Sequence, residues 1–438
     1  MELRCDVAVV GAGAAGLAAA RALSRAGASA TVLEARDRVG GRLYTREDAG
    51  LPVPVELGGE FVHGTADVSF ALLRAANTVA VDTGEGSFTY EDGELREAGD
   101  DPFEIVARVL AQARDLREDK SIDTFLRGLP EGPDTERERR YTRMLVEGFD
   151  AADPAIASTR ALTEEWSSGE GGQMAEQFRP LGGYERLLRT LHGALDPARA
   201  HVRMETPVRA IRRQHDGVTV EATAAGEALT VSARAAIVTL PAGVLSANAV
   251  RFEPELPQRT RDALARIVMG PVTKLVLRFR SAFWERVRDG RYRDGAFFHN
   301  ADAAFPTFWT MLPLRAPLLV AWAGGPKSDA LAHFDQAALV ATALGDLRTL
   351  FGDEPNPRAE LEAVYTHDWQ RDPYARGAYS YVSVGAGDPR AAFAQPVDGC
   401  IFFAGEATAP ASEAGTVAGA LQSGERAAAE ALAALRTP

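Results

Sequence analysis

The feature that restricts the fold most is the pattern at the start of the chain. An apolar run, 6–10, leads into the turn Gly-Ala-Gly-Ala-Ala-Gly at 11–16, and an Ala- and Leu-rich segment follows as far as Ala26. Gly27 ends that segment, and a second apolar run closes at Glu34. A strand, a glycine turn, a helix and a strand in this order predict the βαβ unit with which a dinucleotide-binding domain begins.

The glycines of the turn have separate physical roles in such a domain. Gly11 makes the tight turn, Gly13 lets a diphosphate approach the backbone, and Gly16 lets the helix pack closely on the strand. The N-terminus of the helix adds positive potential for the diphosphate. Glu34 follows Gly11 by about 20 positions, the offset at which a carboxylate accepts hydrogen bonds from an adenosine ribose. A carboxylate there disfavours NADP, and these residues leave both FAD and NAD open.

Later apolar runs are expected to complete the same sheet. One lies at 235–240, and another, 399–405, ends in a glycine turn before a segment of helical composition, 416–435. Shorter alternating runs at 218–220 and 229–231 predict a small antiparallel pair of strands.

A domain that opens at one end of the chain and closes at the other is discontinuous. We predict a Rossmann-like α/β dinucleotide-binding domain made of residues 1–70, 180–255 and 390–438. The stretches between them, 71–179 and 256–389, are predicted to form an inserted α+β substrate-binding domain.

Charge and cysteine content exclude several classes of function. With 48 Lys+Arg against 61 Asp+Glu, the net charge of -13 argues against a nucleic-acid partner and suits a cationic small molecule. Cys5 and Cys400 are too few for a disulfide scaffold or a cysteine-rich metal site. No signal segment precedes the first strand and no apolar run is long enough to cross a bilayer, so we expect a cytoplasmic protein without a membrane partner. The oligomeric state, a homodimer included, stays open.

Lys274 stands out because the chain has only two other lysines, Lys120 and Lys327. In the predicted strand 272–279, alternation places Lys274 on the same face as two valines, where an ammonium group is costly. Two interpretations follow from these residues. Lys274 is either a functional amine or a lysine at a strand edge whose amine reaches water.

Several motifs together indicate a family. Residues 34–42 read Glu-Ala-Arg-Asp-Arg-Val-Gly-Gly-Arg, which resembles the extended signature of the flavin amine oxidases, the family of the monoamine and polyamine oxidases. Segments 56–64, 180–184, 206–211 and 405–408 are similar to further motifs in the family's order. The resemblance implies FAD as cofactor, bound by a discontinuous Rossmann-like FAD-binding domain with an inserted substrate-binding domain.

The resemblance also assigns the cofactor site residue by residue. The implied FAD-binding residues are Gly11, Gly13, Ala14, Ala15, Gly16, Glu34, Ala35, Arg36, Gly41, Arg42, Gly58, Gly59, Glu60, Phe61, Val208, Gly405, Glu406, Thr416 and Val417. Position 407 is an alanine where the family usually has a histidine, but the neighbouring acid is retained. No metal ligand is expected.

Five residues are implied in catalysis. Lys274 corresponds to the lysine that holds a water near flavin N5 and assists the reaction with oxygen, Trp369 to a tryptophan beside the flavin, and Tyr379 to a tyrosine that walls the substrate amine. Without the resemblance, the two aromatic residues would be interpreted as ordinary core. His63 is a candidate to bind or deprotonate the amine, with a solvent-exposed loop histidine as the alternative. Thr416 occupies the position of the second cage tyrosine of monoamine oxidases.

Two further positions make specific predictions about the flavin. Ala378 replaces the cysteine that bonds the flavin covalently in monoamine oxidases, so the FAD is expected to be non-covalent. Val417 begins the final helix, whose backbone N–H and dipole would act on the flavin C2 carbonyl.

The implied function is FAD-dependent oxidation of a small-molecule amine by hydride transfer to N5. The imine product hydrolyses to an aldehyde or ketone plus an amine or ammonia, and O2 becomes hydrogen peroxide. An L-amino acid oxidase on the same fold is an alternative that requires an arginine in the pocket. A desaturase or porphyrinogen oxidase is disfavoured by Lys274 and by the Trp369–Tyr379 spacing. A flavin-binding scaffold without turnover is the alternative of another class.

Overall fold

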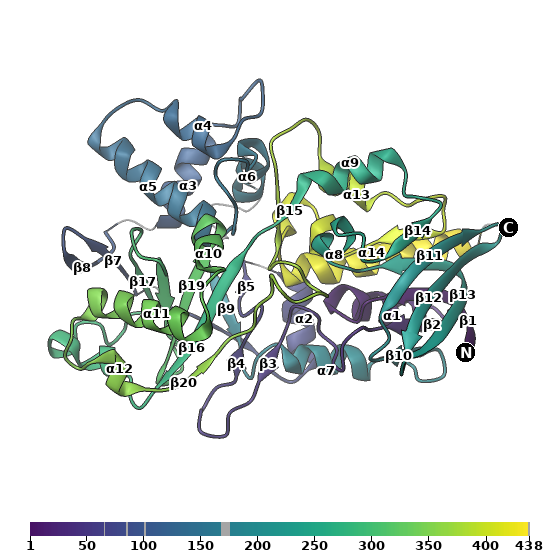
Figure 1. Ribbon diagram of the computed structural model, residues 1–438, viewed down its shortest axis with the longest axis horizontal. Coiled ribbons are helices and arrows are strands. Elements are labelled where there is room, and N and C mark those ends of the chain that lie inside the picture. The colour runs from purple at the N-terminus through teal and green to yellow at the C-terminus, as the bar shows by residue number, and fades with distance from the viewer. Residues whose placement is uncertain (65, 85, 100–101, 168–175, 437–438) are drawn as a thin grey trace.

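A computed structural model describes residues 1–64, 66–84, 86–99, 102–167 and 176–436. Figure 1 shows two large sheets side by side, each with its own helices, and a group of helices above the second sheet. Both chain termini lie beside the first sheet, so this half of the molecule is built from the two ends of the chain. The mixed α/β architecture predicted from the sequence is confirmed.

The first sheet contains the predicted βαβ unit. Its strands in spatial order are β10 (Ala200–Arg203), β2 (Ala30–Leu33), β1 (Glu2–Val10), β13 (Glu227–Val238), β12 (Gly217–Ala224), β11 (Val208–Gln214) and β14 (Arg251–Glu253), with β22 (Ile401–Phe403) beside the end of β13. Strands β10, β2, β1, β13 and β22 run parallel, whereas β12 is antiparallel to both of its neighbours. Segments far apart in the sequence therefore share one sheet.

Strand β13 corrects one prediction. The sequence predicted separate strands at 229–231 and 235–240, but residues 227–238 form one strand. Its first half pairs with β12 and alternates between buried and more accessible positions, whereas its second half pairs with β22 and is buried throughout. The change of pattern marks a change of environment, since a strand covered on both faces needs no polar positions.

Helices cover both faces of the first sheet. On one face lie α1 (Ala14–Arg25), α2 (Asp67–Ala75), α7 (Glu185–Gly193) and α14 (Val417–Arg436). On the other face lie α8 (Ala242–Ser246), α9 (Gln258–Arg266) and α13 (Pro389–Ala394). Helices α1 and α14 pack so closely that a Cβ added at Gly424 would lie only 2.2 Å from the carbonyl oxygen of Ala15. The last helix of the chain therefore packs directly on the first.

The second sheet has the order β20 (Leu361–Tyr365), β16 (Val272–Phe279), β19 (Leu318–Gly324), β18 (Thr307–Trp309), β17 (Phe297–His299), β7 (Ser87–Glu91) and β8 (Glu94–Glu97). Leu275 and Leu277 of β16 pack with leucines of α11 (Gln336–Phe351) in one core. Val276 belongs to a different core with Trp309 and Val320. Lys274 therefore lies on the face of β16 that is turned away from α11.

The remaining elements connect the two sheets. Helices α3 (Pro102–Ala111), α4 (Ile122–Arg127), α5 (Pro133–Gly148) and α6 (Thr159–Ser167) share a core of their own. The short strands are β3 (Thr45–Arg46), β4 (Val55–Glu56), β5 (Val62–His63), β6 (Ala80–Asp82), β9 (Gln177–Pro180), β15 (Ile267–Met269) and β21 (Ser380–Val382). The short helices are η1 (Phe283–Gly290), α10 (Gly325–Leu331), α12 (Pro357–Glu360), η2 (Glu406–Thr408) and η3 (Ala411–Glu413). The domain boundaries stay a prediction.

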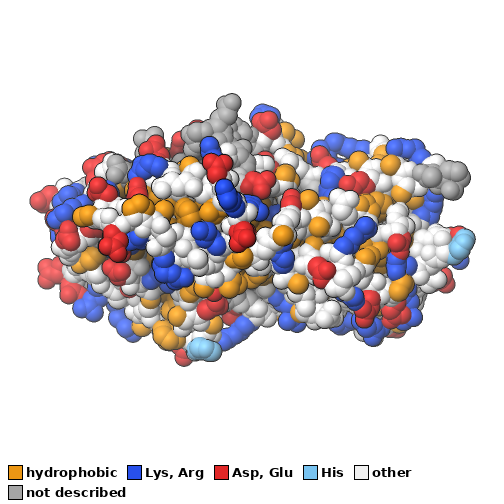
Figure 2. All heavy atoms as spheres, turned by 90° about the horizontal axis from the view of Figure 1, so that it is seen from above, with side chains coloured by type: hydrophobic (Ala, Val, Ile, Leu, Met, Phe, Trp, Pro, Cys, Tyr) orange, Lys and Arg blue, Asp and Glu red, His pale blue; other side chains and the backbone are white. Residues whose placement is uncertain are grey.

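The surface carries charges of both signs. Figure 2 shows acidic and basic side chains interspersed over one long face, an arrangement typical of an ordinary solvated surface. Within the described residues, no helix combines the length and the apolar character that a bilayer crossing would need.

Candidate active site

The carboxyl ends of four parallel strands meet at one edge of the first sheet. β1, β2, β13 and β22 end there and are followed by Gly11, Glu34, Thr239 and the turn at Gly405. This edge is where ligands bind in open α/β sheets. The turn after β1 requires its glycines, because Gly11 has φ +103° and a Cβ at Gly16 would lie 1.9 Å from the Gly11 carbonyl oxygen.

Gly13 differs from these two glycines. It has an ordinary φ of -72°, and the nearest atom that an added Cβ would meet is 3.9 Å away. The protein's own packing therefore leaves the space above Gly13 open, as the approach of a diphosphate requires. Glu34 stands next to it, with one carboxylate oxygen accepting the Ala12 N–H at 2.8 Å and the other accepting the Arg36 N–H at 2.9 Å. The remaining lone pairs of Glu34 can accept ribose hydroxyls.

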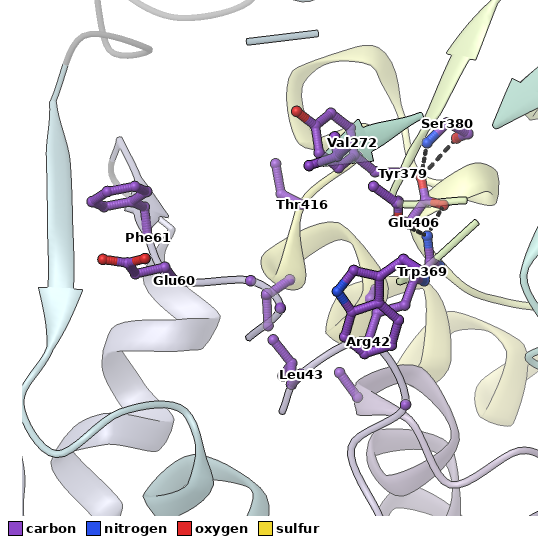
Figure 3. A pocket seen from close by; sticks show the side chains of 18 of the residues that line it. Arg42, Leu43, Glu60, Phe61, Val272, Trp369, Tyr379, Ser380, Glu406 and Thr416 are labelled. Atoms are coloured by element: carbon purple, nitrogen blue, oxygen red, sulfur yellow. Dashed lines mark hydrogen bonds and ion pairs between the residues drawn. The ribbon is translucent and has the colours of Figure 1, made fainter. Parts of the chain in front are cut away.

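Two arginines lie along the same edge, each paired with a buried acid. Arg36 contacts Asp372 at 2.8 Å, and Arg42 contacts Glu406 at 2.9 Å. Burial opposes ionisation of Glu406, but the charges of Arg42 and Arg390 outweigh it and hold the pKa of Glu406 below its ordinary value. Figure 3 shows Arg42 bonded to Glu406. These pairs fix the arginines before any ligand binds.

A cavity of about 960 Å³ begins at this edge and extends to the second sheet. All of the predicted site residues line it except Gly16, which lies beneath the turn. Figure 3 shows Glu60 and Phe61 on one side, Tyr379 and Glu406 on the other, and Thr416 between them. The structure therefore brings together residues that are widely spaced in the sequence.

Lys274 lies deep inside this cavity. Its side chain is 4% exposed, and β16 has a neighbouring strand on each side. The ammonium donates to the carbonyl oxygen of Gly58 at 3.1 Å and to Glu60 Oε2 at 2.8 Å. The interpretation of Lys274 as a strand-edge lysine reaching water is wrong, because both its backbone and its amine are enclosed.

Glu60 was predicted among the cofactor-binding residues, but its carboxylate is bonded within the protein. One oxygen accepts from Lys274, and the other accepts from Arg179 Nε at 3.0 Å and Trp309 Nε1 at 3.1 Å. Burial acts to raise the pKa of Glu60, but the charges of Lys274 and Arg179 prevail and lower it. We refer to Lys274, Glu60 and Arg179 as the lysine cluster.

Trp369 and Tyr379 come from one segment and are both fixed by backbone acceptors. Trp369 is buried and donates from Nε1 to the carbonyl oxygen of Leu57 at 2.8 Å. Tyr379 donates from its hydroxyl to the carbonyl oxygen of Phe149 at 2.6 Å. Burial, reinforced by the charge of Asp150, raises the pKa of Tyr379. The phenol is thus a neutral wall of the cavity.

Thr416 has a structural task that the sequence prediction did not include. Its hydroxyl oxygen accepts the Gly419 N–H at 3.0 Å and its hydroxyl proton goes to the carbonyl oxygen of Glu413 at 2.8 Å. Thr416 therefore caps the N-terminus of α14, which begins at Val417. Both residues line the cavity, so the positive end of the helix faces it.

His63 lies in strand β5 between the rings of Phe61 and Phe149, at centroid distances of 6.1 and 5.3 Å. Its Nδ1 is buried and makes no hydrogen bond within the described residues. Burial lowers the pKa of His63 to about 4, so the ring is neutral at pH 7. The alternative of a loop histidine that meets only solvent is wrong.

A second group of charged residues was not predicted from the sequence. We call it the acidic cluster: Asp150, Glu165 and Arg390. Asp150 and Glu165 line the cavity, and Asp150 accepts from Trp166 Nε1 at 3.2 Å. Glu165 lies 3.3 Å from Arg390. Burial raises the pKa of both acids; the charge of Glu165 adds to this effect at Asp150, and Arg390 opposes it at Glu165.

Part of the acidic cluster could have been found from the sequence. Leu162 and Trp166 are spaced as a buried helix face, and Glu165 follows Leu162 by one helical turn. An acid next to the buried face of a helix is a candidate to line an internal cavity. Asp150 offers no such signal, because it follows the end of α5 in irregular backbone.

Comparisons with known proteins agree with this geometry. Residues 14–432 match the family model described as flavin containing amine oxidoreductase. Probable polyamine oxidase 4 of Arabidopsis thaliana is 31% identical over 440 residues, which cover 92% of this chain and 82% of that protein. Putrescine oxidase bound to putrescine has a similar structure, with a TM-score of 0.82, 26% identity and coverage of 99% and 100% of the two chains. Cyclohexylamine oxidase from Brevibacterium oxydans IH-35A gives a TM-score of 0.82 at 25% identity, over 98% of this chain and 99% of that chain.

Proposed function

This chain belongs to the family of flavin-containing amine oxidoreductases, and we propose that it holds FAD without a covalent bond and oxidises cationic amines, diamines and polyamines included. The observation that carries the proposal is the continuous cavity that joins the glycine turn to Lys274 and Tyr379. Its volume of about 960 Å³ lies near the upper end of the range of ordinary ligand pockets, as a dinucleotide with a substrate beside it requires.

The residues at the sheet edge fit FAD. The open space above Gly13 suits the diphosphate, and Glu34 has lone pairs for the ribose of the adenosine. Arg36 and Arg42 line the cavity and supply donors beyond those of the glycine turn. Val208, at the start of strand β11 of the same sheet, would hold the adenine through its backbone.

The residue at position 378 supports a non-covalent cofactor. Ala378 lines the cavity next to Tyr379, and its methyl group cannot form a thioether. Cys5 and Cys400 are not among the described residues that line the cavity. The carbonyl oxygen of Ala378 accepts from Arg42 at 2.7 Å, which ties this position to the cofactor edge.

Bound FAD supplies a two-electron acceptor that takes hydride at N5 and returns to its oxidised form as O2 becomes hydrogen peroxide. Lys274 places a positive charge in the cavity, where it stabilises the negative charge that develops when oxygen is reduced. The N-terminus of α14 at Val417 acts in the same direction on the flavin carbonyl.

The amine site requires a neutral amine, because a protonated nitrogen has no lone pair to assist the loss of hydride from its α-carbon. Tyr379 and Trp369 provide an aromatic, poorly solvated wall that favours the neutral form. His63 lines the cavity and its ring is neutral, so it places no positive charge beside the amine. Its low pKa makes His63 unsuited to store the proton that the amine loses.

The acids on one side of the cavity disfavour an L-amino acid oxidase, although four arginines also line the cavity: Arg36, Arg42, Arg209 and Arg376. Of the residues that α5, α6 and the loop between them contribute to the cavity lining, the charged ones are Asp150 and Glu165, both carboxylates. A substrate carboxylate would be repelled there, whereas a second ammonium group would be attracted. The polyamine oxidase and putrescine oxidase among the similar proteins support the same substrate class.

The test uses the purified, yellow protein and an amine panel. We expect hydrogen peroxide release with diamines and polyamines and none with amino acids. Denaturation followed by mass spectrometry should give free FAD, and flavin attached to a peptide would contradict the non-covalent assignment. Peroxide release with amino acids alone would favour the L-amino acid oxidase. No release with any monoamine, polyamine or amino acid would favour a flavin-binding scaffold.

A further inference from the structure

The lysine cluster is unusual in how completely its carboxylate is bonded. Glu60 accepts from three donors, Lys274, Arg179 and Trp309, all at 2.8 to 3.1 Å. The side chains of Lys274 and Glu60 are each 4% exposed, and that of Arg179 is 7% exposed. Water therefore does not compete for these bonds, and the direction of each is set by the protein.

The bonds to Lys274 leave one N–H of its ammonium group unassigned. An ammonium has three N–H donors in a pyramidal arrangement. Gly58 takes one through its carbonyl oxygen at 3.1 Å, and Glu60 takes the second at 2.8 Å. Once two directions are fixed, the third is fixed as well.

We propose that Glu60 is a positioning residue whose carboxylate, together with the carbonyl oxygen of Gly58, holds Lys274 so that the third N–H is presented to the oxygen-reacting side of the cavity. This inference rests on the proposed function, because it concerns how Lys274 acts there. A lysine has four flexible carbons, so an unheld ammonium would sample several positions. A displacement of about 1 Å at a reacting centre can cost on the order of 100-fold in rate.

Glu60 can hold Lys274 in one position because Arg179 fixes the position of the Glu60 carboxylate. Arg179 donates to Glu60 from Nε and also to the carbonyl oxygens of Leu312 at 2.8 Å and Thr310 at 3.1 Å. The guanidinium is therefore anchored to backbone, and it stacks over the ring of Phe61 at 5.1 Å. With two cations and one anion, the cluster keeps a net positive charge although Lys274 is paired.

The experiment compares flavin reduction and flavin reoxidation in the holoprotein. Glu60→Gln should slow reoxidation by O2 about 10-fold or more, because the amide cannot accept strongly from the ammonium, while anaerobic reduction by amine changes less than about 3-fold. Lys274→Met should slow reoxidation at least as much. If Glu60 acts through Lys274, the double variant should be no slower than Lys274→Met alone.

Glu56→Gln is the matched control. Glu56 is as buried as Glu60, with 6% of the whole residue exposed in each case, but it bonds to the Tyr184 N–H and the Thr45 hydroxyl instead of the ammonium. Its reoxidation rate should stay within about 2-fold of the unaltered protein. An equal slowing in Glu56→Gln and Glu60→Gln would mean that any change of a buried acid in this region has this effect, and would overturn the positioning role.

A spectroscopic readout uses the scarcity of lysine. Labelling with [15N]lysine gives side-chain signals from only three residues, Lys120, Lys274 and Lys327. The Lys274 ammonium signal should be sharp in the unaltered protein, because two of its three N–H groups are bonded and its side chain is only 4% exposed, and it should broaden in Glu60→Gln. Its absence in Lys274→Met assigns it. An unchanged sharp signal in Glu60→Gln would overturn the inference whatever the enzyme's activity.

The outcomes separate this inference from the proposed function. Slow reoxidation in Lys274→Met with a normal rate in Glu60→Gln would overturn the role of Glu60 and leave the amine oxidase proposal intact. Normal reoxidation in Lys274→Met would overturn both the role of Lys274 and its positioning by Glu60. A protein that releases no peroxide with any amine would contradict the proposed function, and the lysine spectrum would still decide whether Glu60 holds the ammonium.

Discussion

Lys274 and Glu60 of the lysine cluster line the same cavity as Asp150 and Glu165 of the acidic cluster, and the two clusters differ in charge balance. In the lysine cluster, one carboxylate is shared by two cations, and both of its oxygens are bonded to donors. In the acidic cluster, two carboxylates share one cation, Arg390, which contacts Glu165. Within the described residues, the hydrogen-bond donor to Asp150 is the indole N–H of Trp166. One cluster is complete without a ligand, and the other carries an excess of negative charge.

This difference indicates that the charges of the lysine cluster are satisfied within the protein, whereas the acids of the acidic cluster can bind a cationic ligand. Burial raises the pKa of Asp150 well above its ordinary value, whereas the neighbouring cations lower the pKa of Glu60 although Glu60 is the less exposed of the two. A buried acid without a cation is stabilised by taking up a proton or by binding a cationic ligand. A substrate ammonium would supply the missing charge at Asp150, while nothing further is needed at Glu60.

The largest effect is expected on stability, when a cation is removed from the lysine cluster. Arg179→Met should lower the free energy of unfolding by about 3 to 5 kcal/mol, because it leaves Glu60 short of a partner and two backbone carbonyls without their donor. Chemical denaturation of the holoprotein measures this. Arg189→Met, which breaks the exposed pair with Glu185, should cost less than about 1 kcal/mol. Equal losses in the two variants would show that burial of the cluster adds nothing.

The second prediction concerns an acid beside the lysine cluster that does respond to pH. Burial raises the pKa of Glu56 to about 7, opposed by bonds from Tyr184 and Thr45. The folded state thus holds a proton that the unfolded chain, with a pKa near the ordinary 4.5, has already released. The stability from the neutral form is fully present below the unfolded pKa and is lost as the pH rises through about 7.

Glu56→Gln should remove this loss, which amounts to about 3 kcal/mol between pH 4 and pH 8. The measurement is Tm against pH for both proteins. The Tm of the variant should rise relative to the Tm of the unaltered protein as the pH increases from 5 to 8. Parallel curves would show that Glu56 does not change protonation on unfolding in this range.

Much of the cofactor edge could be predicted from the sequence because its signals are local. Gly11 and Gly16 are required by backbone geometry within one turn, and Glu34 follows at a fixed offset. The strand 272–279 was predicted with its observed bounds because it is a short run rich in Val and Leu, and the structure buries both of its faces in separate cores. The rarity of lysine was a further signal at Lys274.

The clusters themselves could not be predicted, because each depends on contacts between distant segments. Glu60 and Arg179 are 119 positions apart, and Lys274 and Glu60 are 214 positions apart. Glu165 and Arg390 are separated by 225 positions. Nothing in the local sequence of Asp150 shows that its neighbours leave it without a cation. Charge balance is a property of the folded arrangement, whereas turns and strands are properties of short segments.

The third prediction tests whether the acidic cluster selects the substrate. Asp150→Asn should lower kcat/KM for a diamine about 10- to 100-fold, because a hydrogen bond between ammonium and carboxylate is replaced by a neutral one, and should change kcat/KM for a monoamine of similar length less than about 3-fold. Steady-state peroxide assays measure both. Glu164→Gln removes a charge from an exposed position next to Glu165 and is the matched control. An equal loss of kcat/KM for the two amines would mean that Asp150 affects the shape of the cavity but does not bind the second ammonium group of the diamine.

The smallest expected effect separates packing from charge at Thr416, which lines the same cavity. Thr416→Val keeps the side-chain volume but removes the hydroxyl that caps α14, so the free energy of unfolding should fall by about 1 kcal/mol. Because neither cluster loses a charge, the ratio of diamine to monoamine kcat/KM should stay unchanged. Thr416→Ser, which keeps the hydroxyl, should restore most of the stability. A changed ratio in Thr416→Val would assign substrate selection to the width of the cavity at this position, and would weaken the argument that the excess negative charge of the acidic cluster sets it.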